Sequence, residues 1–145
     1  MRRFLVLAAV AAALCVAPAA AQAETYRNGP VRADVGLTSI ELRNSEVSRT
    51  WNRAPFGTAA MVDLRGADRV WSGGSRDFTL AVAGLDVGSE RFTVDSVTVT
   101  KLDRGGLRVA MRLVGPLPGL AVTRVACGSS AKSSSTVRMR NSGAL

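Results

Sequence analysis

The chain has 145 residues and a formal net charge of +8 at pH 7, and 47% of its residues are hydrophobic, which suits one domain of ordinary size. It has no histidine, which excludes a serine–histidine catalytic triad and any histidine-ligated metal site. Its basic residues are spread singly along the chain, so we expect a solvated, mildly basic surface and no nucleic-acid partner.

Residues 1–23 have the three parts of a secretory signal peptide. Two arginines follow Met1, residues 4–16 form an apolar run, and Ala21-Gln22-Ala23 is a small-residue cleavage site. The apolar run is shorter than the roughly 20 residues that cross a membrane as a helix, and no later run is longer. We therefore predict no membrane span and a secreted protein, extracellular or periplasmic, that begins near Glu24.

Apolar and polar residues alternate from residue 35 to residue 125, which is typical of β-strands with one buried face. The clearest run is 107–113, in which Leu107, Val109, Met111 and Leu113 alternate with Arg108, Ala110 and Arg112. Shorter alternating sets are Ile40 with Leu42, Val47 with Trp51, Val62 with Leu64, and Phe78 with Leu80 and Val82. Within residues 92–99 the apolar positions change parity, so we expect a β-bulge at Asp95-Ser96.

Turn residues separate these runs at short intervals, at Asn44-Ser45, 65–68, Gly73-Gly74, 103–106 and 115–119. No apolar positions repeat at helical spacing over three turns between residues 24 and 145. Several short strands separated by such turns predict an all-β fold, namely an antiparallel β-sandwich over residues 24–126, either complete or truncated.

Residues 127–145 have a different composition. They contain six serines and no acidic residue, and the alternation stops. This composition predicts a disordered tail. Two origins are open: an aberrant, frame-shifted end of a truncated chain, or the soft tail of a small domain. Cys127, at its start, is the lone cysteine after the leader.

The stretch VWSGGSRDF (70–78) combines a tryptophan with an Arg-Asp pair. Indole rings pack against the C–H faces of sugars, and Arg and Asp fix hydroxyl groups through charge-assisted hydrogen bonds. The candidates for carbohydrate contact are Trp71, Arg76, Asp77 and Trp51. If Asp77 binds sugar, Asp77→Asn should abolish binding and leave stability unchanged. In the structural alternative, Trp71 fills the sheet edge and Arg76 pairs with Asp77 or Asp68.

Five stretches follow one another in order: LRNSEVSRTW (42–51), AAMVDLRG (59–66), VWSGGSRDFTL (70–80), GGLRVAMRLVGP (105–116) and PGLAVTRV (118–125). This order resembles the N-terminal β-sandwich of secreted bacterial α-galactosidases, in the manner of glycoside hydrolase family 36 and related galactose-mutarotase-like sandwiches. The resemblance covers about residues 35–126. The matching positions are Asn44, Arg49, Trp51, Trp71, Arg76, Asp77 and Phe78.

In that family the catalytic aspartates lie in a downstream (β/α)₈ barrel, which takes about 250 residues and has no room in this chain. The resemblance therefore implies a non-catalytic, carbohydrate-contacting accessory domain, truncated before the barrel. It implies no catalytic residue, no metal and no cofactor, and a galactoside-type carbohydrate as ligand. Truncation would leave strand edges unpaired and the apolar residues of 107–113 partly uncovered, so self-association is expected. The alternative is a small secreted structural or protein-interaction β-sandwich of the cell envelope with no sugar ligand.

Overall fold

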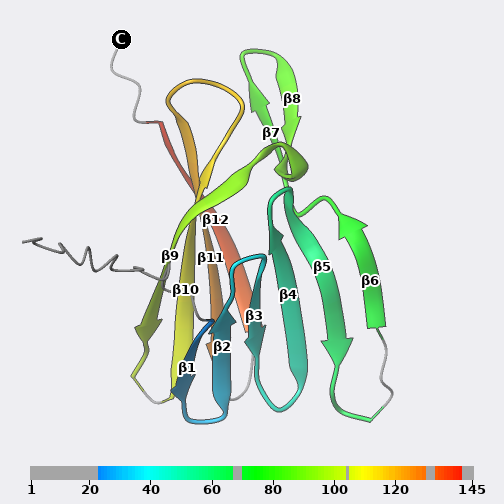
Figure 1. The fold of residues 1–145 in the computed structure, drawn as a ribbon, viewed down its shortest axis with the longest axis vertical. Helices are drawn as coiled ribbons and strands as arrows, with labels where there is room; N and C mark the ends of the chain where they lie inside the picture. Colours follow the sequence, from blue (N-terminus) through cyan, green and yellow to red (C-terminus); the bar gives the residue numbers. More distant parts are fainter. Residues whose placement is uncertain (1–22, 67–69, 104, 130–132, 142–145) are drawn as a thin grey trace, which may run out of the picture.

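The structure, a computed structural model, describes residues 23–66, 70–103, 105–129 and 133–141. These residues form three antiparallel sheets (Figure 1). The predicted all-β, antiparallel fold is confirmed. Of the predicted signal peptide, all but Ala23 lies outside the described residues. In the part of the chain that the structure describes, no helix has the length and hydrophobicity that crossing a membrane requires.

The first sheet consists of six strands, each paired with the next along the chain. They are β1 (Glu24–Asn28), β2 (Val31–Val35), β3 (Ser39–Arg43), β4 (Val47–Arg53), β5 (Phe56–Asp63) and β6 (Val70–Ser75). Successive side chains of a strand point to opposite faces of the sheet, and one face of this sheet is buried. Its buried apolar residues are Val31, Ala33, Ile40, Leu42, Trp51 and Phe56.

The second sheet has the order β12-β11-β10-β9. Its strands are β9 (Thr93–Lys101), β10 (Gly106–Val114), β11 (Leu120–Ser129) and β12 (Ser133–Asn141). The alternation predicted along 107–113 is confirmed, since Leu107, Val109, Met111 and Leu113 are each 0% exposed. The expectation that truncation leaves these four residues partly uncovered is wrong, because they share one buried cluster with the inward face of the first sheet.

β9 contains a bulge at the predicted place. Arg112 of β10 is paired with Ser96, but the next residue, Leu113, is paired with Val94, so Asp95 is the extra residue. The bulge lets Val94 and Val97, which differ in parity, both pack toward the core. The prediction of a bulge at Asp95-Ser96 is therefore confirmed.

The third sheet is a hairpin of β7 (Thr79–Val82) and β8 (Leu85–Gly88), followed by the short 3₁₀ helix η1 (Ser89–Arg91). It projects beyond the ends of the other strands at the top of Figure 1. Three aromatic rings hold its base to the core. The Phe78 ring centroid lies 6.1 Å from that of Phe56 and 5.5 Å from that of Phe92.

The C-terminal residues differ from the prediction. Residues 127–129 continue β11, and Ser133–Asn141 forms β12, which pairs with β11 from Leu120 to Gly128. The domain therefore does not end at Ala126, and the prediction of a disordered tail is wrong for these residues; 130–132 and 142–145 lie outside the described residues. Strand pairing uses backbone groups that every non-proline residue carries, so a strand can form without alternating apolar side chains. A search for hydrophobic alternation therefore misses such a strand.

The register of β12 can be tested with the lone cysteine of β11. Cys127 lies directly opposite Ser134, and such residues have Cβ atoms about 4.5–5.5 Å apart, close to the range of a disulfide. We expect Ser134→Cys to form a disulfide with Cys127 under mild oxidation, detected by mass spectrometry of the linked peptides. The control Ser135→Cys lies opposite Ala126 and should stay reduced. Equal cross-linking in both variants, or none in either, would contradict the register.

Candidate functional site

Two of the predicted sugar contacts, Trp51 and Asp77, meet inside the protein. Trp51 lies in β4 and is 1% exposed, and Asp77 lies between β6 and β7 with a side chain that is 0% exposed. The indole Nε1 of Trp51 donates a long hydrogen bond of 3.4 Å to Asp77 Oδ1. Burial leaves a sugar no access to either side chain in this conformation.

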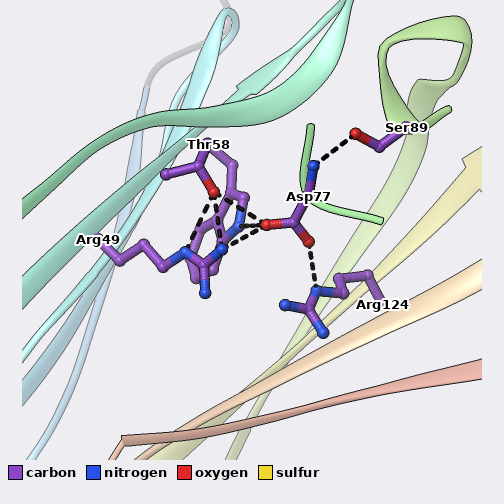
Figure 2. Close-up of polar contacts among 6 residues, drawn as sticks. Arg49, Thr58, Asp77, Ser89 and Arg124 are labelled. Carbon is purple, nitrogen blue, oxygen red and sulfur yellow. Dashed lines mark hydrogen bonds and ion pairs between the residues drawn. The ribbon is translucent and has the colours of Figure 1, made fainter. Parts of the chain in front are cut away.

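The Asp77 carboxylate is bound on one side by residues of the first sheet (Figure 2). Its Oδ1 atom accepts hydrogen bonds from Arg49 Nη2 and, over 2.9 Å, from Thr58 Oγ1. Arg49 also donates to Thr58 Oγ1 over 2.7 Å, so the hydroxyl group links the cation and the anion. The guanidinium carbon of Arg49 lies 5.0 Å from the Trp51 ring centroid, in range of a cation–π interaction.

The other side of the carboxylate faces the second sheet. Arg124 of β11 places Nε 2.8 Å from Asp77 Oδ2, as an ion pair without the alignment of a hydrogen bond. The backbone N–H of Asp77 donates to Ser89 Oγ of η1 over 2.8 Å. Asp77 thus contacts both large sheets and the base of the hairpin. We name these six residues the Asp77 cluster: Arg49, Trp51, Thr58, Asp77, Ser89 and Arg124.

The Asp77 cluster contains two cations and one anion. The side chains of Arg49 and Arg124 are 25% and 6% exposed, so the second is almost completely out of water. Burial lowers the pKa of the Arg49 guanidinium; the Asp77 charge acts in the opposite direction and the Arg124 charge in the same direction. An arginine nonetheless stays protonated throughout the physiological range. The enclosed carboxylate therefore neutralises arginine charge between the two sheets.

Sequence reasoning included Arg49 among the matched positions but did not connect it with Asp77, and it missed Arg124, Thr58 and Ser89. A signal was present for the two arginines. Arg49 has the same parity as Val47 and Trp51, and Arg124 the same parity as the buried Val122 and Ala126. An arginine at an inward-facing position needs a buried counter-ion.

The remaining two candidates, Arg76 and Trp71, are not members of this cluster. Arg76 is exposed, and its Nε and Nη2 atoms donate to the Glu90 carboxylate over 3.1 and 2.9 Å. The structural alternative had expected Asp77 or Asp68 as its partner; Asp77 pairs elsewhere, and Asp68 lies outside the described residues. Trp71 belongs to β6 and is paired with Met61 of β5. Its side chain lies outside what the structure describes.

Comparison of the chain with protein-family models, with curated proteins and with solved structures found no match. The resemblance to glycoside hydrolase family 36 therefore stays a prediction that rests on the residues alone. Of its matched positions, Arg49, Trp51 and Asp77 belong to the Asp77 cluster. Asn44 has a different role, because its side chain accepts hydrogen bonds from the backbone N–H groups of Glu46 and Val47 in the β3–β4 turn.

The Asp77 cluster predicts a large loss of stability for Asp77→Asn. The substitution removes the carboxylate that pairs with both arginines and leaves Arg124 buried without that counter-ion. Breaking such a buried pair costs about 3–5 kcal/mol of the free energy of unfolding, which urea denaturation followed by tryptophan fluorescence would measure. This outcome is the opposite of the unchanged stability expected of a sugar-binding Asp77.

Asp95→Asn is the matched control, since it makes the same chemical change at an exposed ion pair. Asp95 Oδ2 lies 2.6 Å from Arg112 Nη1, with side chains 43% and 57% exposed. Exposed pairs contribute about 1 kcal/mol or less, so this variant should unfold close to the parent. Equally small losses in both variants would contradict the structural role of Asp77.

Proposed function

We propose that this chain is a secreted, non-catalytic β-sandwich domain with a structural or protein-interaction role. The sandwich arrangement is supported by the single buried cluster that residues of both large sheets share. The observation that carries the functional proposal is the enclosure of Asp77 between Arg49 and Arg124. The Asp77 carboxylate joins the two large sheets. Its side chain is 0% exposed, so a substrate cannot reach it in this conformation.

A second candidate is an accessory domain that contacts a galactoside, as the resemblance to glycoside hydrolase family 36 implies. One observation favours it: the Arg76–Glu90 pair is exposed, with side chains 56% and 45% accessible, near the strand that carries Trp71. A guanidinium and a carboxylate side by side can donate to and accept from neighbouring sugar hydroxyls. In this version Trp51 and Asp77 support the binding surface from below and do not touch the sugar.

Galactoside binding separates the two candidates. For the purified protein we expect no saturable binding of galactosides in isothermal titration calorimetry, and no turnover of aryl α-galactosides, because the proposed role is structural. If saturable binding is found, Arg76→Ala should abolish it and the control Arg91→Ala, at a neighbouring exposed arginine, should not. That result would replace the structural proposal with the accessory-domain one.

Secretion is tested separately, because it rests on residues 1–23 alone. We expect the exported protein to begin near Glu24, since the Ala-x-Ala site ends at Ala23. Intact-mass spectrometry of the mature protein measures this start. Recovery of a chain that still carries Met1 would contradict the signal peptide.

A further inference from the structure

Three arginines form a row across the outer face of the first sheet. Arg27 of β1 lies directly opposite Arg32 of β2, and Arg32 lies directly opposite Arg43 of β3. Their neighbours in the strands, such as Ala33 and Leu42, are buried, so the row lies on the face away from the core. Like charges directly opposite one another destabilise a sheet. Pairing of the strands therefore does not explain this arrangement.

The charge of the arginine row is only partly neutralised. Arg32 is held by Asp34, with Nε 2.6 Å from Oδ2 and Nη2 2.8 Å from Oδ1. Within the described ranges, neither Arg27 nor Arg43 takes part in an ion pair. Glu41 lies on the same face, directly opposite Asp34, so three guanidinium groups and two carboxylates leave a local excess of one positive charge.

A surface cavity of about 290 Å³ lies beside the arginine row. Its walls are the three arginines, Val31 and the residues of two turns, Gly29-Pro30 and Asn44-Ser45, and none of its lining residues is acidic. Pockets for drug-sized ligands begin at about 300 Å³. The cavity therefore has room for one charged group or one sugar ring, and its lining selects for negative charge.

The turns that form this cavity are fastened to the second sheet. The amide of Asn28 donates to the carbonyl oxygens of Leu102 and Gly106, both over 2.8 Å, next to the first turn. The amide of Asn44 donates to the carbonyl oxygen of Ser129 over 3.0 Å at the second turn. A cavity with walls held in this way needs little ordering when a ligand binds.

We propose that the arginine row is a binding site for an oxyanion, such as a sulfate, phosphate or carboxylate group. Arg27 and Arg43 contact the anion from the two sides of the row, and Arg32, held by Asp34, lies between them. Guanidinium groups bind oxyanions through paired, charge-assisted hydrogen bonds. The anion can be a free inorganic ion or the charged group of an acidic saccharide. The site does not depend on the proposed function, since none of its residues belongs to the Asp77 cluster.

The test is a titration of the protein with sodium sulfate at constant ionic strength, followed by calorimetry and by the NMR signals of the arginine Nε–H groups. We expect saturable binding that shifts the signals of Arg27 and Arg43. The double variant Arg27→Gln/Arg43→Gln should lose at least about tenfold in affinity, because each charge-assisted contact contributes about that much. The melting temperature of this variant should be equal to that of the parent or higher, because it removes like charges that face one another on neighbouring strands.

Arg91→Gln/Arg108→Gln is the matched control, since it removes the same charge at two exposed arginines outside the row. Its affinity for sulfate should stay within about twofold of the parent, as only long-range electrostatics change. Equal losses in the two double variants would show a general charge effect and overturn the site. Absence of saturable sulfate binding to the parent would overturn it as well.

A second titration, with a sulfated disaccharide and its unsulfated counterpart, identifies the source of the anion. If the sulfated sugar binds at least about tenfold more tightly than inorganic sulfate, the sugar ring contributes contacts and the natural ligand is an acidic saccharide. Equal affinities for sulfate and the sulfated sugar identify a site for the free anion. Equal affinities for the sulfated and unsulfated sugars would overturn the proposal, because the charge would then contribute nothing.

Discussion

The contact on which the arrangement of this domain depends is the carboxylate of Asp77 between two guanidinium groups. Arg49 comes from the first sheet and Arg124 from the second, and both stand at positions where the strand alternation directs side chains inward. Removing such charges from water costs several kcal/mol each unless they are paired. Asp77 belongs to neither sheet and pairs with both arginines. The positions of the two sheets therefore fix where the segment between β6 and β7, which carries Asp77, lies.

The neighbours of Asp77 extend this constraint to the hairpin. Phe78 follows Asp77 in the chain and packs against Phe56 and Phe92, while the backbone of Asp77 donates to Ser89, the first residue of η1. The hairpin is thereby attached through both polar and aromatic contacts at its base. Its tip, with Leu85 64% exposed, lies away from the core and contributes little to it.

The arginines of the chain occupy two contrasting environments. Inside, Arg49 and Arg124 share the carboxylate of Asp77, whose side chain is 0% exposed. Outside, strand register brings Arg27, Arg32 and Arg43 together beside two carboxylates, Asp34 and Glu41. A mildly basic, solvated surface is what composition alone predicts. The strand register brings part of that positive charge together at one cavity. The net charge of a chain does not show where on the surface its charges lie.

The sequence by itself determined the β class of the fold, the buried face of residues 107–113 and the bulge at Asp95, because the two-residue period of a strand is a local property and a change of parity interrupts it. It did not predict β1 or β2, and it placed a turn at Gly73-Gly74, which lies inside β6. Local pattern also marked Arg49 and Arg124 as inward-facing. Only the tertiary structure decided that Asp77 is their counter-ion, that Ser133–Asn141 adds a strand, and that three arginines share one row. These outcomes depend on sheet register and on contacts between residues up to 85 positions apart, such as Asn44 with Ser129. Ion pairs and strand pairs between residues so far apart produce no periodic pattern in the sequence. Which residues pair is decided only when the sheets have formed and bring them together.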